Sequence, residues 1–326
     1  MKAKYERIVK ELPMITTVTL NPALDITLEM KEFKLDKYNT VKKVTRIPGG
    51  KGINVSKAVR AYGLDTMALG FLGGHAGHFI AEQLRENGIT TNFWHIEEET
   101  RTNIIIAEEQ NKTHTLLSDP GPRITKRDFE RFKSIFSRVM SQSKIVTLSG
   151  SLPNDIPDDV YYQLINLAHQ KKVNTILDAS GIPFEKGLEA KPKLAKPDLR
   201  ASGNRVFDKV VNNQDAAIKI AHEIANRGPQ IAVISYQNTK DIIATKEEVW
   251  LAESVNKEVV NIIGTAEAML AGFAIKMVEE EKADMTGMIQ FAMACGLASA
   301  LTEEEEFHNK EDIIRCLPCV KVTKLK

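Results

Sequence analysis

Pro48-Gly49-Gly50-Lys51-Gly52-Ile53-Asn54-Val55 is the most informative segment of this 326-residue chain. Three glycines surround one lysine, and apolar residues at helical spacing follow at once. Glycines let a backbone approach a ligand closely, and the amino end of a helix offers free N–H groups with positive partial charge. The segment therefore predicts an anion-binding loop at the start of a helix. It is not a Walker A loop, because the spacing Gly-x4-Gly-Lys-Ser/Thr is absent.

Two further segments bear on the same site. Upstream, alternating β-branched residues from Ile15 predict a strand that Asn21-Pro22 ends. Asp25 then follows the carboxyl end of a strand, where open α/β sheets bind ligands, and its carboxylate can accept hydrogen bonds from sugar hydroxyls. Downstream, Asn261-Ile-Ile-Gly264-Thr265-Ala266-Glu267 predicts a strand end, a tight turn and a helix start with a carboxylate in its first turn.

In this order and at these separations, the three segments resemble the ribokinase-like (PfkB) family of carbohydrate kinases. The likeness extends to its phosphosugar branch, the tagatose-6-phosphate kinases and 1-phosphofructokinases, of which Asn21-Pro22-Ala23-Leu24-Asp25 and Gly49–Val55 are typical. It runs from about Met14 to near the C-terminus. The resemblance implies an α/β fold, a three-layer α/β/α core with a mostly parallel central sheet, and a small β-sheet lid.

The pattern of elements points to the same organisation. Helical periodicity covers residues 54–63 and 76–88, and beyond residue 125 strands alternate with helices, as in a parallel sheet. The expected strands there are Ile145–Leu148, Asn174–Leu177, Leu194–Lys196 and Ile231–Ser235. We expect a core of residues 14–25, 48–91 and 118–326, a β lid of residues 26–47 and 92–117, and an N-terminal extension, 1–13, resembling a short charged helix. The resemblance implies that the lid serves as a homodimer contact. The alternative is that these residues form two solvated hairpins.

Composition excludes several classes of partner. Hydrophobic residues make up 43% and aromatic residues 6% of the chain, and the net charge is +1, so no overall field favours nucleic acid or a membrane surface. No apolar stretch reaches the ~18 residues of a membrane span, and Met1–Pro13 lacks the apolar centre of a secretion signal. A cytoplasmic α/β enzyme is the expected class.

Cysteine and histidine patterns were considered as metal or redox sites. Cys316-Leu-Pro-Cys319 has thioredoxin-like spacing, but it lies near the chain end and has no second pair for zinc. Ordinary thiols in a reducing compartment are the preferred interpretation over a redox or metal role. His75 and His78 have i, i+3 spacing without an evident third ligand, so we expect them to be bystanders.

The sugar-phosphate side of the site needs cations for a phosphate that the substrate already carries. Lys51 and Arg101 are the candidates, since arginine offers a planar fork that matches phosphate and lysine a point charge. In the resembled branch the Thr-Arg arginine meets the substrate phosphate; the alternative for Arg101 is a surface salt bridge. The residues expected around the sugar itself are Asp25, Gly49, Gly50, Asn54 and Ser149, the last from the loop Ser149-Gly150-Ser151-Leu152-Pro153.

The nucleotide side departs from the family pattern at the catalytic helix. The family has Gly-Ala-Gly-Asp, whose amides form an anion hole and whose Asp is the base, whereas this chain has Gly264-Thr265-Ala266-Glu267. Glu267 keeps a carboxylate but adds a methylene, which moves its oxygens by about 1.5 Å. Errors near ~1 Å can cost ~10²-fold in rate. Ala266 keeps its N–H but adds a Cβ that hinders close approach by phosphate.

Two more family motifs are altered. Lys-Pro-Asn-x-x-Glu appears as Lys196-Pro197-Asp198-Leu199-Arg200-Ala201, and the nucleotide loop Ser-Leu-Gly-x-x-Gly appears as Ser235-Tyr236-Gln237-Asn238-Thr239-Lys240 without its glycines. Asp198 can still hold Mg²⁺ through oxygen or water. Lys196, Lys240 or another lysine is a candidate to replace the lost donors, and Ser235 stays a nucleotide-binding candidate.

The sequence supports three functional hypotheses. The leading one is an ATP- and Mg²⁺-dependent kinase of tagatose 6-phosphate or fructose 1-phosphate, with Glu267 as general base and the amides of residues 264–267 facing the transferred phosphoryl group. The second is a degenerate, non-catalytic sugar-phosphate sensor. The third, a kinase of a nucleoside or unphosphorylated sugar, would leave Lys51 and Arg101 without an anionic ligand.

Overall fold

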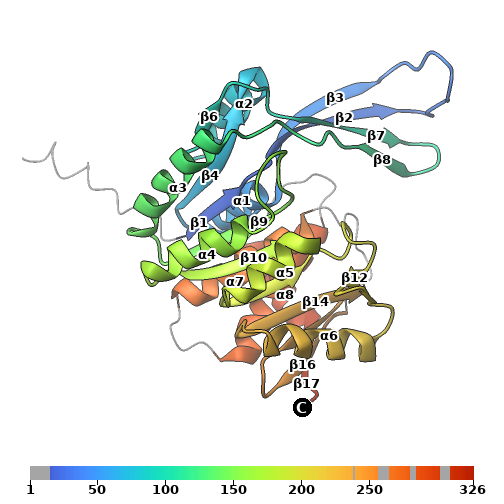
Figure 1. Ribbon diagram of the computed structural model, residues 1–326. Coiled ribbons are helices and arrows are strands. Elements are labelled where there is room, and N and C mark those ends of the chain that lie inside the picture. Colours follow the sequence, from blue (N-terminus) through green and yellow to red (C-terminus); the bar gives the residue numbers. More distant parts are fainter. Residues whose placement is uncertain (1–14, 238, 256–263, 280–283, 302–308) are drawn as a thin grey trace, which may run out of the picture.

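The computed structural model describes residues 15–237, 239–255, 264–279, 284–301 and 309–326 (Figure 1). An 11-stranded sheet forms its centre, in the order β17-β16-β15-β14-β11-β10-β9-β1-β4-β5, with β6 paired to β4. Pairs from β14 to β5 and β6 are parallel, and the β14-β15-β16-β17 edge is antiparallel. The strands are β1 Ile15–Thr19, β4 Thr66–Gly73, β5 Thr90–Thr91, β6 Trp94–Ile96, β9 Ile145–Ser149, β10 Asn174–Ala179, β11 Leu194–Pro197, β14 Ile231–Gln237, β15 Lys240–Ala244, β16 Val249–Ser254 and β17 Val320–Lys324.

Helices cover both faces of this sheet, which confirms the predicted three-layer α/β/α architecture. One buried cluster joins the sheet to α3–α6, in front in Figure 1, and another joins its opposite face to α1, α7, α8 and α9. The helices are α1 Lys51–Tyr62, α2 Gly74–Glu86, α3 Lys126–Met140, α4 Val160–Gln170, α5 Gly181–Glu189, α6 Gln214–Asn226, α7 Thr265–Glu279, α8 Met285–Ala300 and α9 Lys310–Cys316. No helix in these described ranges is long and apolar enough to cross a membrane.

The central strands are apolar on both sides because helices cover both. On β14, Ile234 packs toward α3–α6 while its neighbour Val233 packs toward α7 and α8, and both are fully buried. Helices α7 and α8 approach each other closely, since a Cβ on Gly272 would lie 2.7 Å from the Cα of Ala292. This packing fixes the amino end of α7 beside the carboxyl edge of the sheet.

A second sheet of four strands, in the order β3-β2-β7-β8, projects from the core at the upper right of Figure 1. Its strands are β2 Ala23–Met30, β3 Lys43–Gly49, β7 Thr102–Glu108 and β8 Thr113–Leu117. Strand β6, by contrast, pairs with β4 of the main sheet. The remaining short elements are β12 Arg205–Val206, β13 Lys209–Val210 and a 3₁₀ turn at Leu317–Cys319.

Local signals in the sequence predict several elements correctly. The predicted helices at 54–63 and 76–88 correspond to α1 and α2, and each is followed by a left-handed glycine, Gly63 (φ +102°) and Gly88 (φ +72°). All four predicted core strands after residue 125 are present. The charged helix expected at 1–13 and the strand end expected at 261–263 lie outside the described residues.

Candidate active site

Polar side chains form one row at the carboxyl edge of the parallel strands. The strand register pairs Thr19 of β1 with Ser149 of β9, Ser149 with Asp178 of β10, and Asp178 with Lys196 of β11. All four side chains are buried, and the Ser149 hydroxyl has no hydrogen-bond partner among the residues that the structure describes. Since parallel α/β sheets bind ligands at this edge, the row marks the floor of a candidate site.

The glycine run joins β3 directly to α1. Gly49 ends β3, and Gly50 caps α1 with φ +120°, a conformation that favours glycine. A Cβ on Gly49 would lie 1.9 Å from an Asp25 carboxylate oxygen, and one on Gly50 would lie 2.7 Å from the Thr19 methyl group. Glycine is therefore required here because the backbone presses against both neighbouring side chains.

Asp25 follows the carboxyl end of β1, and it lies near the start of the next strand, β2. Its carboxylate accepts a hydrogen bond of 2.7 Å from the Asn103 side chain, which stands opposite it on β7. Burial raises the pKa of Asp25, although Asn103 and the nearby charges of Lys57 and Arg101 oppose that shift. Asn103 was missed in the sequence, although it lies only two residues after Arg101.

Arg101 is held by neutral oxygens. Its guanidinium donates to the Asn21 carbonyl at 3.2 and 3.0 Å and to the Asp119 carbonyl at 3.0 Å. Burial lowers the pKa of Arg101, which the charges of Asp25 and Asp119 partly offset. These carbonyls carry no net charge, so the three hydrogen bonds do not neutralise the guanidinium, which could still bind an anionic ligand.

Lys51 lies at the centre of a carboxylate cluster. Its Nζ is 3.0 Å from Asp178 Oδ2, 3.0 Å from Asp198 Oδ2 and 3.4 Å from Glu267 Oε1. Burial alone would lower the pKa of Lys51, but the three carboxylates raise it above its ordinary value. The structure thus brings Lys51 and Glu267 together, while the contacts of Arg101 are made with a different part of the site.

Asp198, the residue predicted to hold Mg²⁺, follows β11. Its Oδ1 accepts the N–H groups of Arg200 and Ala201 at 3.1 and 3.3 Å. Burial would raise the pKa of Asp198, but Lys51 and Lys196 lower it. Within the described residues no group of three or more His, Cys, Asp or Glu side chains could hold a metal. A magnesium ion bound mainly by substrate phosphates and water needs only one or two protein carboxylates, and Asp198 could supply one.

A cavity of about 440 Å³ opens between the amino end of α7, the second half of α8 and strands β14–β16. Lys51, Asp198, Thr265, Ala266 and Glu267 line it near α7. A volume of this size suits a small-molecule ligand. The cavity joins the carboxylate cluster to the region of the altered nucleotide loop.

Side chains line the part of this cavity where the family motif has glycines. Ser235 donates its hydroxyl to Asp241, and burial raises the pKa of Asp241 to about 6. Lys196 lines the cavity at 4% exposure, and among the described residues its ammonium makes no side-chain hydrogen bond or ion pair. Its charge nevertheless acts to lower the pKa of Asp178 and Asp198. Lys240 instead pairs with Glu253 at 2.9 Å, so Lys196 is the better candidate of the two to contact a ligand in the cavity.

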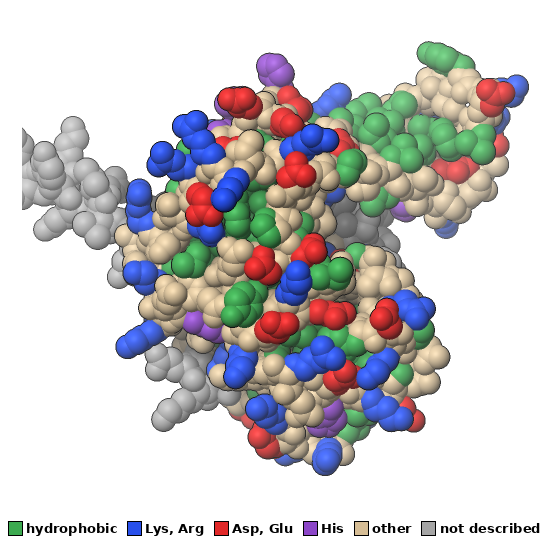
Figure 2. Space-filling model, viewed as in Figure 1, with side chains coloured by type: hydrophobic (Ala, Val, Ile, Leu, Met, Phe, Trp, Pro, Cys, Tyr) green, Lys and Arg blue, Asp and Glu red, His purple; other side chains and the backbone are tan. Residues whose placement is uncertain are grey.

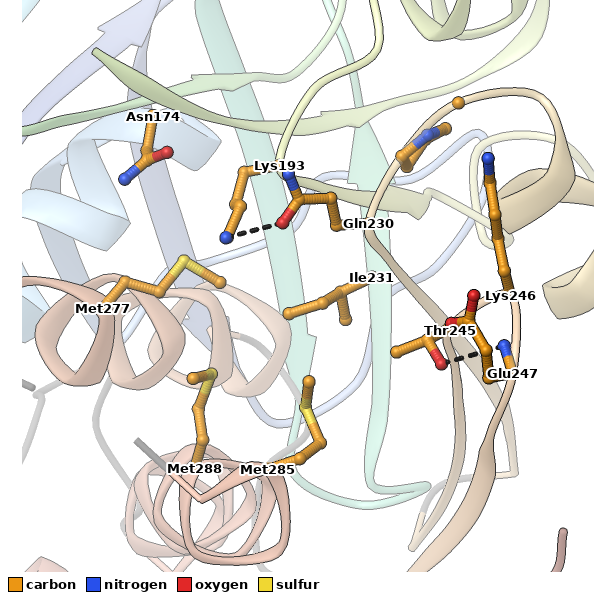
Figure 3. Close-up of a pocket in the computed structure, with 12 residues that line it drawn as sticks. Asn174, Lys193, Gln230, Ile231, Thr245, Lys246, Glu247, Met277, Met285 and Met288 are labelled. Atoms are coloured by element: carbon orange, nitrogen blue, oxygen red, sulfur yellow. Dashed lines mark hydrogen bonds between the residues drawn. The ribbon is translucent and has the colours of Figure 1, made fainter. Parts of the chain in front are cut away.

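A second hollow, of about 740 Å³, lies at the opposite edge of the sheet (Figure 3). Met277, Met285 and Met288 of α7 and α8 form one side, and Lys193 donates to the neighbouring Gln230 at 2.6 Å on another. It lies at the amino ends of β10, β11 and β14, away from the carboxylate cluster and the glycine run. The smaller cavity is therefore the better candidate for chemistry.

Comparison with known proteins agrees with this geometry. Residues 18–309 match the pfkB family of carbohydrate kinases. The chain is 30% identical to 1-phosphofructokinase of Bacillus subtilis, and the match covers 96% of this chain and 100% of that protein. It is 31% identical to tagatose-6-phosphate kinase of Staphylococcus epidermidis, and that match covers 89% of this chain and 93% of that protein. A solved structure from Thermotoga maritima, described as a possible 1-phosphofructokinase, has a TM-score of 0.89 at 33% identity and covers 96% of this chain and 100% of that one.

Proposed function

Because this chain belongs to the pfkB family of carbohydrate kinases, we propose that it transfers the γ-phosphoryl group of ATP to a hydroxyl of a phosphorylated ketohexose. Tagatose 6-phosphate and fructose 1-phosphate are the two candidate substrates. The observation that carries the proposal is the contact between Lys51 and Glu267, since it joins the glycine run of the sugar motif to the helix of the phosphoryl-transfer motif.

Phosphoryl transfer needs alignment, a base and charge stabilisation rather than covalent help. Glu267 is the proposed base for the acceptor hydroxyl, and the N–H groups of residues 264–267 at the start of α7 would face the transferred phosphoryl group. Asp25, Asn54 and Ser149 would bind sugar hydroxyls beside the backbone of Gly49 and Gly50.

Lys51 and Arg101, the two cations expected to bind the substrate phosphate, have different roles in this proposal. In either substrate the existing phosphate and the reacting hydroxyl lie at opposite ends of the six-carbon chain. Lys51 contacts the proposed base, so we assign it to the reacting end. Arg101, with neutral hydrogen-bond partners, is the proposed anchor of the existing phosphate.

The nucleotide would lie in the 440 Å³ cavity. Lys196 and the amino end of α7 would contact its phosphates, Ser235 would line its wall, and Asp198 would lie beside Mg²⁺. Bound Mg²⁺ would neutralise charge on the phosphates and help align them. Such a reaction favours the cytoplasm as the compartment.

Turnover is tested by coupled ADP detection with ATP and each ketohexose phosphate. We expect ADP with at least one of them and none with the unphosphorylated sugars. Absence of turnover with both phosphates at high enzyme concentration would reject the kinase. Calorimetry would then show whether the chain binds sugar phosphate without ATP, as the sensor alternative requires.

We also propose that the four-stranded sheet is a lid and a homodimer contact. Apolar side chains on it and on the connection between β2 and β3 are exposed, and Figure 2 shows part of this surface at the upper right. They include Phe33, Leu35, Tyr38, Val44, Leu116 and Leu117. Sedimentation equilibrium should give a dimer mass, and Leu116→Glu should shift it toward the monomer; a monomeric wild type would reject this contact.

A further inference from the structure

Asp178 is a completely buried carboxylate that the proposed reaction does not yet use. It lies near the end of β10, its side chain is 0% exposed, and its two oxygens are 3.3 and 3.0 Å from Lys51 Nζ. Lys51, Asp198 and Glu267 line the 440 Å³ cavity, but Asp178 does not. A ligand in that cavity would therefore meet Asp178 only through the Lys51 ammonium.

The Asp178 carboxylate has a rigid support. Strand β10 is paired on both sides, with β9 and β11, and the Asp178 carbonyl accepts the Gly150 N–H at 2.8 Å. Lysine, by contrast, carries its charge on a flexible four-carbon stem. A carboxylate fixed by the sheet and contacting the ammonium with both oxygens is suited to hold that flexible charge in one place.

The other two carboxylates cannot do this throughout a reaction. Glu267 would have to turn toward the acceptor hydroxyl, and Asp198 toward the nucleotide and its cation. Each would then contact Lys51 less, so that Asp178 would remain as its constant partner. A cation fixed before the phosphoryl group arrives stabilises charge without reorganisation during transfer.

We infer that Asp178 is a positioning residue that holds the Lys51 ammonium at the point where the phosphoryl group passes from nucleotide to sugar. This inference rests on the proposed function. A purely structural ion pair is the competing explanation, because removing one partner of a buried pair leaves an uncompensated charge and destabilises the fold.

The test is a double-mutant cycle of Asp178→Asn and Lys51→Met, measured in kcat, in KM for both substrates and in the urea midpoint of unfolding. We expect Asp178→Asn to lower kcat by about 10- to 100-fold, the cost of a ~1 Å misplacement, with both KM values within about threefold. In the Lys51→Met background, Asp178→Asn should not lower kcat any further. Asp65→Asn, in the exposed pair with Arg60, is the matched control and should leave kcat unchanged.

If Lys51→Met alone fails to fold, Asp178→Asn decides the inference by itself. A lower kcat with both KM values and the urea midpoint close to those of the wild type then supports it. Equal fractional losses of kcat from Asp178→Asn in both backgrounds would overturn it, as would a lower midpoint with unchanged kcat. An inactive wild type would instead reject the proposed function itself.

Discussion

The two ends of the candidate site are built in different ways. At the sugar end the backbone defines the shape, because Gly49 and Gly50 leave no room for side chains beside Asp25 and Thr19. At the nucleotide end the family's glycines are replaced, and the charged side chains of Lys196 and Asp241 line the cavity instead. A backbone-built end should respond to steric change, and a side-chain-built end to charge and pH.

The carboxylate where both ends meet should show the largest effect. Glu267→Gln keeps the size of the side chain but cannot accept the proton, so kcat should fall by about 10²- to 10⁴-fold. Sugar-phosphate affinity, measured by calorimetry, should stay within about threefold because the sugar residues are untouched. An unchanged kcat would remove Glu267 as base and weaken the link between the two ends.

Charge at the nucleotide end should appear as a pH-dependent stability. Burial raises the pKa of Asp241 to about 6 from its ordinary 3.8. The folded state then binds the proton more tightly than the unfolded state, so this carboxyl lowers stability progressively as pH rises from about 4 to above 6. The cost at pH 7–8 corresponds to about 3 kcal/mol.

Asp241→Asn should remove that cost while keeping an oxygen for Ser235. The unfolding free energy of the variant relative to wild type, from urea titrations, should be similar at pH 4 and higher by up to about 3 kcal/mol at pH 7.5. The Asp65→Asn surface variant should show no such trend. If the difference in unfolding free energy did not change with pH, other groups at the nucleotide end would be offsetting the cost of burying the Asp241 carboxylate.

Much of this contrast was visible in the sequence because its signals are local. The glycine run, the start of α1 and the carboxylate in the first turn of α7 are each specified within a few residues, and each was predicted. The loss of glycines at residues 235–240 was equally plain. What these local patterns specify is element type and chemistry, not which distant side chains meet.

The partners that sequence reasoning missed depend on non-local pairing. Asn103 reaches Asp25 only through the register of β7 with β2. Asp178 reaches Lys51 only because α1, which packs on β1 and β9, begins beside the carboxyl end of β10. Asp178 follows the strand-like run Thr175-Ile176-Leu177, so the rule that singled out Asp25, an acid near the carboxyl end of a strand, could have found it. The contact of Lys51 with Glu267 had no such local signal.

At the sugar end, Arg101 offers the next effect in size. Arg101→Lys keeps the positive charge but removes the fork that binds phosphate with two parallel hydrogen bonds. KM for the sugar phosphate should rise by about tenfold, as expected for the loss of one charged hydrogen bond, while KM for ATP stays unchanged. A rise in both KM values would mean that the two ends are not separate.

The smallest effect should come from restoring one family glycine at the nucleotide end. Ala266→Gly removes the Cβ in the first turn of α7, where Ala266 lines the cavity, and lets phosphate approach the N–H groups more closely. Glycine in a helix costs about 0.5–1 kcal/mol of stability, so the urea midpoint should fall slightly. KM for ATP should nevertheless fall several-fold, since about 1 kcal/mol is roughly fivefold in affinity. Unimproved ATP kinetics in this variant would indicate that Lys196, rather than the amino end of α7, dominates phosphate binding.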